Sequence, residues 1–157
     1  MEARLNPFAS PLLGKVYKHL IAANAVLAES TLPLATQELV KLRASQINGC
    51  GFCVDMHFKD VVHAGEEATR LNLVAAWREA TVFTEAERAA LEIAEQGTRL
   101  ADGTAGVTDE AWANAAEHYD EEQLAALVGV LAVINAFNRG NVALRMPAGS
   151  YRPGQFA

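Results

Sequence analysis

Apolar residues recur every three or four positions along most of the chain, and no stretch shows the sustained alternation of a half-buried strand. The spacing is clearest in one set of residues that share a helical face, namely Leu124, Leu127, Val128, Leu131 and Ile134. Alanine and leucine, both strong helix formers, are plentiful, whereas glycine and proline stand at segment ends. The pattern predicts an all-α protein.

Stop and start signals divide the first half of the chain into helices. The first helix is expected from about Lys15 to Glu29. The second follows Pro33, a residue suited to a first helical turn, and ends near Asn48 and Gly49, a helix-terminating pair. A third helix is expected to begin at or just before residue 50 and to end at residue 65, and residues 66–77 form a shorter fourth piece.

Capping signals mark the helices of the second half. Thr84 with Glu87 has the form of a capping box, which opens a fifth helix through about residue 100. Residues 101–110 are expected to form a loop, with a sixth helix starting near Thr108. Asp120 with Gln123 can cap a seventh helix. The tail, 145–157, is rich in glycine and proline and is expected to wrap a surface or a neighbour.

The chain has the length and composition of one folded domain. It has 157 residues, of which 51% are hydrophobic and 20% charged, and it shows no repeat, low-complexity segment or linker. We therefore expect a single-domain helical bundle over residues 1–157. The net charge of −6 and the absence of a basic cluster argue against a nucleic-acid partner.

The termini and the apolar runs bear on location. The N-terminal residues carry an acid and two prolines where a signal peptide would have a basic start and an apolar run. The most apolar run, 124–134, is too short to cross a bilayer, so we expect a cytoplasmic protein with no membrane partner. In a reducing compartment the two cysteines are not expected to form a permanent disulfide, which leaves catalysis, metal binding or burial.

Both cysteines lie in one stretch, "NGCGFCVDMH", residues 48–57. At about 100° per residue, Cys50, Cys53 and His57 share a helical face about 60° wide. Asp60 falls at the edge of this face, whereas His63 points elsewhere. The spacing therefore brings two thiols and an imidazole together if the segment is a helix.

Thiol chemistry would be favoured by this arrangement. The thiolate is the reactive form of cysteine, and a helix N-terminus stabilises negative charge on Cys50. A cysteine-x-x-cysteine pair at such a position has a lowered thiol pKa, and His57 can accept or return a proton. A pair spaced i to i+3 can also close into a disulfide with little backbone movement.

A carboxylate is expected beside the imidazole. If the second and third helices form an antiparallel hairpin about Asn48 and Gly49, Glu38 lies level with Asp60 and within a turn of His57. Glu38 could then orient His57 and hold its proton. Lys41 and Arg43, on the same helix, could supply local positive charge.

Other readings of these residues do not involve redox chemistry. The cysteines could be inert core residues. A structural zinc ion needs three or four convergent ligands, and the chain offers only Cys50, Cys53 and His57 because His63 faces away, so we expect no metal. His19 and His118 are expected in surface or core roles. Phe52 and Met56 are expected to be core rather than substrate contacts, and Asn135 and Asn138 not to be catalytic.

The run "ELVKLRASQINGCGFCVDMHFKDVVHAGE", residues 38–66, resembles the core of the alkylhydroperoxidase D-like proteins of the carboxymuconolactone decarboxylase superfamily. The family pattern is a glutamate, eleven residues, cysteine-x-x-cysteine, three residues and a histidine. Glu38, Cys50, Cys53 and His57 fit it without a gap. The likeness extends through 70–95 and again at "INAFNR", so it covers about residues 35–140.

The resemblance implies an all-helical fold that assembles into trimers or hexamers and has thiol-dependent peroxidase or disulfide reductase activity. A hydroperoxide would oxidise Cys53 to a sulfenic acid, and Cys50 would resolve it as a disulfide that a dithiol reductant or redox partner protein restores. Glu38 and His57 would form the proton relay, and no cofactor is implied. The helix dipole, in contrast, acts most on Cys50.

The chain departs from the family pattern at one position. The best-studied branch has a second histidine just before the second cysteine, and here that residue is Phe52. The relay is therefore shorter by one member. Two other functions stay open: a general disulfide reductase, and a redox-responsive binding or assembly protein with weak or no turnover. The decarboxylases of the superfamily do not use the cysteine pair, so its presence argues against their reaction.

Overall fold

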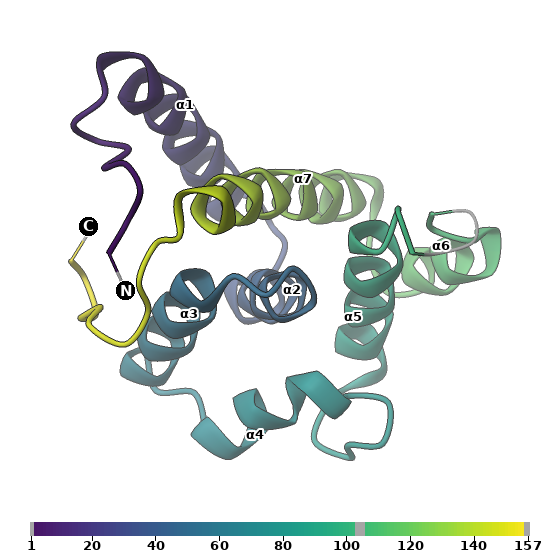
Figure 1. Cartoon of the computed structure of the whole chain (residues 1–157). Coiled ribbons are helices and arrows are strands. Elements are labelled where there is room, and N and C mark those ends of the chain that lie inside the picture. Colours follow the sequence, from purple (N-terminus) through teal and green to yellow (C-terminus); the bar gives the residue numbers. More distant parts are fainter. Residues whose placement is uncertain (1, 103–105, 156–157) are drawn as a thin grey trace.

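The chain folds as a bundle of helices around one central helix (Figure 1). The computed structural model describes residues 2–102 and 106–155. Over these two ranges it contains seven α-helices, one short 3-10 helix and no strand. The all-α prediction is confirmed. The part of the expected loop at residues 103–105 lies outside the described residues.

The elements are, in chain order, α1 (Pro11–Ala28), α2 (Leu34–Ile47), α3 (Gly51–His63), α4 (Ala68–Asn72), η1 (Leu73–Ala76), α5 (Glu85–Thr98), α6 (Asp109–Ala116) and α7 (Glu121–Leu144). The first helix begins four residues earlier than expected, because the Ser10 hydroxyl accepts a hydrogen bond from the Leu13 N–H and Pro11 fits the first turn. The fourth piece is two short elements rather than one helix.

Both predicted capping boxes are present. Thr84 and Glu87 bond reciprocally at the start of α5, and Asp120 and Gln123 do so at the start of α7. These contacts satisfy backbone N–H groups that have no partner within the helix. The local sequence therefore fixes where these two helices begin.

Helix α2 is the most enclosed element, since most of its side chains are buried. It packs against α3, α5, α7 and η1. One apolar cluster joins α2 to α5, α6 and α7, and a second fills the space between α2, the α4–η1 segment and α5. Because α3 packs directly on α2, a residue on one of these helices can reach the other.

Helix α7 is longer than the apolar run at 124–134 indicates. It spans 24 residues, and by length and composition alone it is apolar enough to cross a membrane. In the bundle it packs against α1, α2, α3, α5 and α6. Leu127 and Val130 on this helix are fully buried in the core.

Helix α1 and the C-terminal segment complete the bundle (Figure 1). Helix α1 projects from the rest of the protein and packs chiefly against α7. The C-terminal segment wraps over the chain's own α3, as the sequence led us to expect of this segment. The Gly149 N–H donates to Asp55 at 2.8 Å, and Lys59 donates to the Tyr151 carbonyl at 3.0 Å.

Candidate active site

The turn between α2 and α3 places the two cysteines. Gly49 adopts a positive φ of 66°, which is available to glycine at little cost, and the Cys50 N–H closes the end of α2 by donating to the Ser45 carbonyl. Cys50 is then the N-cap of α3, and its sulfur accepts a hydrogen bond from the Cys53 N–H at 3.4 Å. The third helix thus begins at Gly51, one residue later than expected, with Cys50 as its cap.

Both cysteines are free thiols and both are buried, with 2% of Cys50 and 1% of Cys53 exposed. A hydrogen bond from the Cys50 thiol lowers the pKa of Cys53 to about 6, although burial opposes this shift. The same bond, together with burial, raises the pKa of the Cys50 thiol. These directions favour the thiolate on Cys53 over one on Cys50, the sulfur nearer the helix end.

Glu38 lies beside His57, as the hairpin geometry predicts. The distance from Glu38 Oε2 to His57 Nδ1 is 2.8 Å, and Lys41 Nζ lies 2.8 Å from Glu38 Oε1. Burial alone would raise the pKa of Glu38, but the hydrogen bond and charge of His57 and the ammonium group of Lys41 lower it to about 2. An ionised carboxylate only accepts hydrogen bonds, so Nδ1 of His57 is the donor to Glu38, and Nε2 is the ring nitrogen that this bond leaves available.

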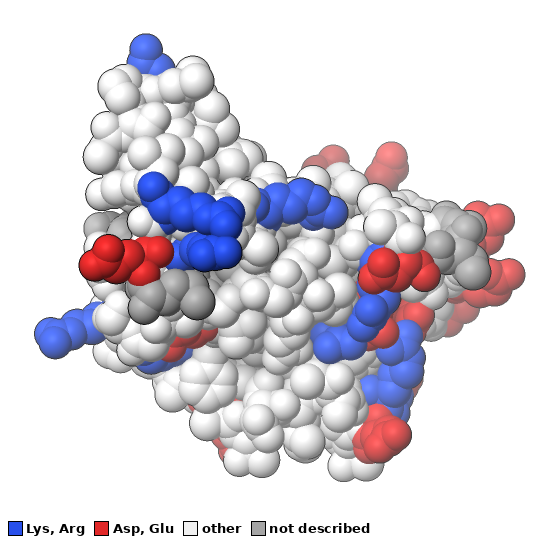
Figure 2. All heavy atoms as spheres, in the orientation of Figure 1, with Lys and Arg blue, Asp and Glu red and all other residues white. Residues whose placement is uncertain are grey.

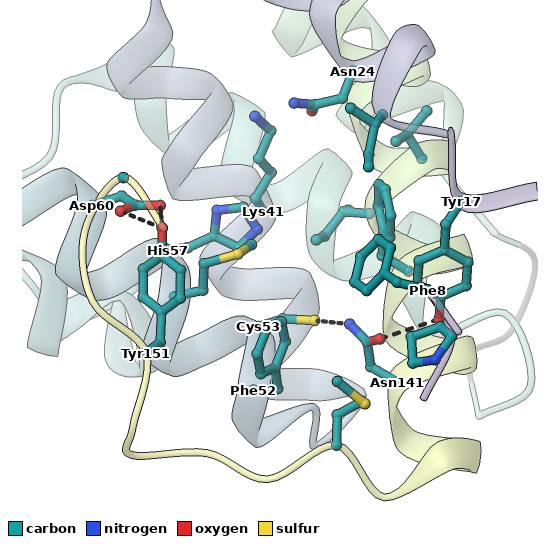
Figure 3. Close-up of a pocket in the computed structure, with 18 residues that line it drawn as sticks. Phe8, Tyr17, Asn24, Lys41, Phe52, Cys53, His57, Asp60, Asn141 and Tyr151 are labelled. Carbon is teal, nitrogen blue, oxygen red and sulfur yellow. Dashed lines mark hydrogen bonds between the residues drawn. The ribbon is translucent and has the colours of Figure 1, made fainter. Parts of the chain in front are cut away.

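Cys53 and His57 line a pocket of about 670 Å³ (Figure 3). Side chains of α1, α2, α3 and α7 form its walls, together with residues before α1 and after α7. Most are apolar. Phe52 and Met56 are part of this lining and only half-buried, so the expectation that both would be core residues is wrong. Phe52 packs edge-on against Tyr151 of the C-terminal segment.

Cys50 lines a different, smaller pocket of about 450 Å³. Arg145 and the segment that follows α7 form its far side. Phe52, Asn141 and Met146 line both pockets and so stand between them. The two sulfurs are therefore reached from two different sides.

Asn141 is a site residue that the sequence reasoning missed. Its side-chain N–H donates to Cys53 Sγ at 3.3 Å, and the Tyr17 hydroxyl donates to its Oδ1 at 3.1 Å. A signal was present in the sequence, because Asn135, Asn138 and Asn141 follow one another at intervals of three on an apolar helix. Buried polar side chains need partners, and such a row indicates a buried polar network.

The first two asparagines of this row tie α7 to the end of α2. Asn48 donates to Asn135 and to Asn138, each at 2.9 Å, and Asn138 donates to the Ser45 hydroxyl at 3.0 Å. Asn138 has no exposed surface. The expectation that neither residue is catalytic stays a prediction.

The remaining candidates have other positions. Arg43 does not face the site: it pairs with Glu95 of α5 at 2.8 Å, so the expectation that it adds charge there is wrong. Asp60 accepts hydrogen bonds from the Tyr151 hydroxyl at 2.8 and 2.9 Å. His19, His63 and His118 are exposed. Within the described residues, no group of three or more His, Cys, Asp or Glu side chains is arranged to hold a metal ion.

Known proteins resemble the chain in sequence and in fold. The sequence model of the Carboxymuconolactone decarboxylase family matches residues 14–96. The uncharacterised protein YdfG of Bacillus subtilis is 40% identical over 122 residues, which is 78% of this chain and 82% of YdfG.

Solved structures extend the likeness to nearly the whole chain. A protein of unknown function from Agrobacterium tumefaciens, for which the antioxidant defence role of AhpD has been suggested, has a TM-score of 0.87 at 35% identity and covers 96% of this chain and 100% of its own. The debrominase Bmp8 has a TM-score of 0.74 at 20% identity, covers 89% and 73% of the two chains, and shares the fold.

Proposed function

The chain belongs to the carboxymuconolactone decarboxylase family, as an AhpD-like member, and on that premise we propose that it is a thiol-dependent peroxidase. One observation carries the proposal: Cys53, on which a thiolate is favoured, lines a large apolar pocket beside His57, which Glu38 holds at 2.8 Å. A low-pKa thiolate beside an oriented base is the arrangement that nucleophilic cysteine chemistry requires.

The first step is oxidation of Cys53 by the hydroperoxide. His57 takes the Cys53 proton on Nε2, and the thiolate attacks the outer peroxide oxygen. The S–O bond forms while the O–O bond breaks, so the sulfur is oxidised by two electrons to a sulfenic acid. The alkoxide leaves with the proton that His57 returns and becomes the alcohol. Glu38 stabilises the imidazolium while His57 holds the proton.

The second step forms the disulfide. Cys50 lies one helical turn from Cys53, and its sulfur attacks the sulfenic sulfur. The S–S bond forms, the S–O bond breaks, and hydroxide leaves as water with the Cys50 proton. A dithiol reductant then attacks the Cys50–Cys53 disulfide. The reductant is oxidised to its own disulfide, and both cysteine thiols are restored. Because Cys50 lines the second pocket, a reductant there reaches it without entering the peroxide pocket.

The pocket supports an organic hydroperoxide as the substrate. Its volume of about 670 Å³ is far larger than hydrogen peroxide needs, and its lining is mostly apolar and aromatic. An apolar substrate body would be stabilised there by burial, and hydrogen peroxide would gain nothing from such walls. We therefore expect a preference for bulky apolar hydroperoxides.

Reduction of small disulfides is a second candidate activity. The observation that favours this activity is Phe52, which stands where the best-studied branch has a second relay histidine. Phe52 packs against Tyr151. Thiol–disulfide exchange needs one thiolate and a resolving thiol but no proton delivery to an alkoxide. A shorter relay would therefore reduce peroxide turnover more than disulfide exchange.

Peroxide consumption by the purified reduced chain tests the proposal. With dithiothreitol as reductant, cumene hydroperoxide is expected to be consumed with a higher kcat/KM than hydrogen peroxide. Cys53→Ser is expected to abolish turnover. Once the dithiothreitol has been removed, Cys50→Ser is expected to consume one equivalent of peroxide and then stop, with a sulfenic acid that dimedone traps on Cys53 and mass spectrometry locates.

Three results would contradict the proposal in different ways. A dimedone adduct found only in Cys53→Ser would exchange the roles of the two cysteines. Reduction of a small disulfide without peroxide consumption would leave the second activity. Failure of both reactions would exclude an enzymatic thiol cycle and leave a redox-responsive binding or assembly protein.

A further inference from the structure

A chain of two hydrogen bonds leads from helix α1 to the Cys53 sulfur (Figure 3). The Tyr17 hydroxyl of α1 donates to Oδ1 of Asn141 at 3.1 Å, and Nδ2 of Asn141 on α7 donates to Cys53 Sγ at 3.3 Å. Tyr17 and Asn141 are both buried. Neither belongs to the set of Glu38, His57 and the two cysteines that performs the thiol cycle proposed above.

The direction of these two hydrogen bonds determines whether a negative charge on the Cys53 sulfur is stabilised. A carboxamide has a donating and an accepting end, and the two ends exchange when the group rotates by half a turn. With Oδ1 bound to the Tyr17 hydroxyl, only the amino end faces Cys53. A thiolate is stabilised by an N–H donor, whereas a carbonyl oxygen in the same place would repel it.

Tyr17 keeps the proton that it donates in this position. Burial raises the pKa of Tyr17, and the charges of Cys53 and Cys50 add to the effect, so the phenol keeps its proton. The hydrogen bond from this hydroxyl to Oδ1 of Asn141 favours the amide orientation in which the amino end faces the thiolate.

The packing around Tyr17 holds its hydroxyl in place. Its ring lies edge-on between Phe8, at 5.9 Å between ring centroids, and Phe137, at 5.7 Å. The hydroxyl lies over the backbone of Gly140 on α7. A Cβ atom at residue 140 would overlap the Tyr17 hydroxyl, so a glycine there makes the close approach possible.

From this geometry we propose that Asn141 is a catalytic residue that stabilises the Cys53 thiolate, and that Tyr17 is a positioning residue that keeps the Asn141 amide in the donating orientation. The role in turnover rests on the proposed function. The effect on the thiolate does not, because it concerns ionisation of the reduced protein without any peroxide.

Other titratable groups lie around Cys53 and must stay constant in the test. Besides Tyr17 itself, the titratable groups that face Cys53 or line its pocket are Cys50, His57, Lys41, Asp60 and Tyr151. None of the substitutions below removes one of these five groups, and Tyr17→Phe removes only the hydroxyl under test. A change in the Cys53 pKa can therefore be assigned to the two hydrogen bonds.

The experiment measures the thiolate of the full-length reduced chain as a function of pH, by its ultraviolet absorbance and by the rate of iodoacetamide labelling at Cys53. Asn141→Leu removes the donor and is expected to raise the Cys53 pKa by about one pH unit or more, since hydrogen bonds to charged groups are the strong ones. Tyr17→Phe is expected to raise it by a smaller amount. Tyr119→Phe is the matched control, because Tyr119 is also buried and its hydroxyl also donates, at 2.7 Å to the Ala86 carbonyl.

Gly140→Ala displaces the Tyr17 hydroxyl without removing it and is expected to raise the Cys53 pKa as Tyr17→Phe does. The double variant is expected to equal Tyr17→Phe alone, because the two changes act through one bond. Circular dichroism confirms that each variant is folded, and Tyr17→Phe with Gly140→Ala keeps the test decisive if Asn141→Leu does not fold.

Three results would overturn the proposal, in whole or in part. An unchanged Cys53 pKa in Asn141→Leu overturns the assignment of Asn141. An unchanged pKa in Tyr17→Phe and in Gly140→Ala, or an equal rise in Tyr119→Phe, overturns the positioning role of Tyr17. If these variants raise the pKa as expected but the wild-type chain consumes no peroxide, the proposed function fails and the present inference stands.

Discussion

At the scale of single residues, Glu38 holds two other polar side chains of the site. Its two oxygens separately accept hydrogen bonds from His57 and Lys41, each at 2.8 Å. Lys41 is almost fully enclosed, with 6% of its side chain exposed, and Glu38 is the charge that compensates it. Because the pKa of Glu38 is lowered to about 2, its carboxylate stays ionised throughout the pH range in which a thiol peroxidase would work.

We predict that Glu38→Gln lowers the kcat/KM of hydroperoxide reduction by about 10–100-fold, because His57 loses the charge that orients it and stabilises its protonated form. Steady-state peroxide consumption measures this effect. The substitution also leaves the Lys41 ammonium without a counterion, so the free energy of unfolding is expected to fall by about 1–3 kcal/mol in chemical denaturation.

Glu92→Gln is the matched control for this prediction. The Glu92 side chain is 24% exposed, close to the 21% of Glu38, and it pairs with Arg78 at 2.7 Å and lines neither of the two pockets. It is expected to leave kcat/KM unchanged. Equal peroxide turnover in Glu38→Gln and Glu92→Gln would remove Glu38 from the proposed relay.

The sequence could predict part of this site and not the rest. Glu38 and His57 were placed correctly because they stand on consecutive helices joined by a short turn, so spacing along the chain determines their register. Asn141 and Tyr17 come from α7 and α1, far away in sequence, and their positions depend on how two distant helices pack. The pocket walls also depend on how distant helices pack. The angles of a single helix therefore could not predict that Phe52 and Met56 line the pocket.

At the scale of elements, local signals predicted boundaries well where side chains bond to the backbone of their own helix. The capping residues Thr84, Thr108 and Asp120 start α5, α6 and α7 as expected. The fourth segment was predicted less well. Its change from α4 to η1 coincides with the burial of Leu71 and Val74 against the second apolar cluster, a tertiary contact that single-sequence periodicity does not contain.

Glu95 joins two of these elements. From α5 it accepts hydrogen bonds from Arg43 of α2, at 2.8 Å, and from the Trp77 indole after η1, at 3.0 Å. Arg78 lies 3.0 Å away. Burial opposes ionisation, but the bonds from Trp77 and Arg43 prevail and lower the pKa of Glu95 to about 2.

We predict that Glu95→Gln lowers the free energy of unfolding at pH 7 by about 1–3 kcal/mol, because hydrogen bonds to a charged acceptor are lost. The direction in which this contribution changes with pH follows from the lowered pKa of Glu95. The contribution of Glu95 is fully present above its unfolded value of about 4.3 and is lost as the pH falls towards 2. Urea denaturation at several pH values should therefore show wild type and variant converging in acid.

Glu79→Gln serves as the control, because Glu79 is exposed in the turn before α5. It is expected to change the free energy of unfolding by only a few tenths of a kcal/mol, as surface substitutions usually do. A constant difference between wild type and Glu95→Gln from pH 7 down to pH 2 would contradict ionisation as the origin of the effect.

At the scale of the whole molecule, α1 exposes more apolar surface than a helix packed on one side needs to. Four large side chains on it are exposed, namely Leu12, Val16, Ile21 and Val26. Figure 2 shows the projecting part of the protein as mostly uncharged except near its end. Large apolar side chains exposed in this number favour a site of association, and α1 also carries Tyr17, which lines the pocket.

The whole-molecule prediction is that the chain forms a homo-oligomer, a trimer or hexamer as the family resemblance implies, with α1 in the subunit contact. Leu12 is 77% and Val26 69% exposed, so charges placed there should not disturb the folded subunit but would be buried without partners in a contact. We expect Leu12→Glu with Val26→Glu to shift the mass in light scattering from the oligomer to the monomer.

Leu100→Glu is the control, since Leu100 is 63% exposed beyond the end of α5. A monomeric wild type, or an oligomer that the α1 pair leaves intact, would contradict the prediction. The Cys53 pKa of the monomer tests a link between subunit contact and thiol ionisation. A raised pKa would show that link, because the subunit contact and the Tyr17–Asn141 hydrogen bond both depend on the position of α1.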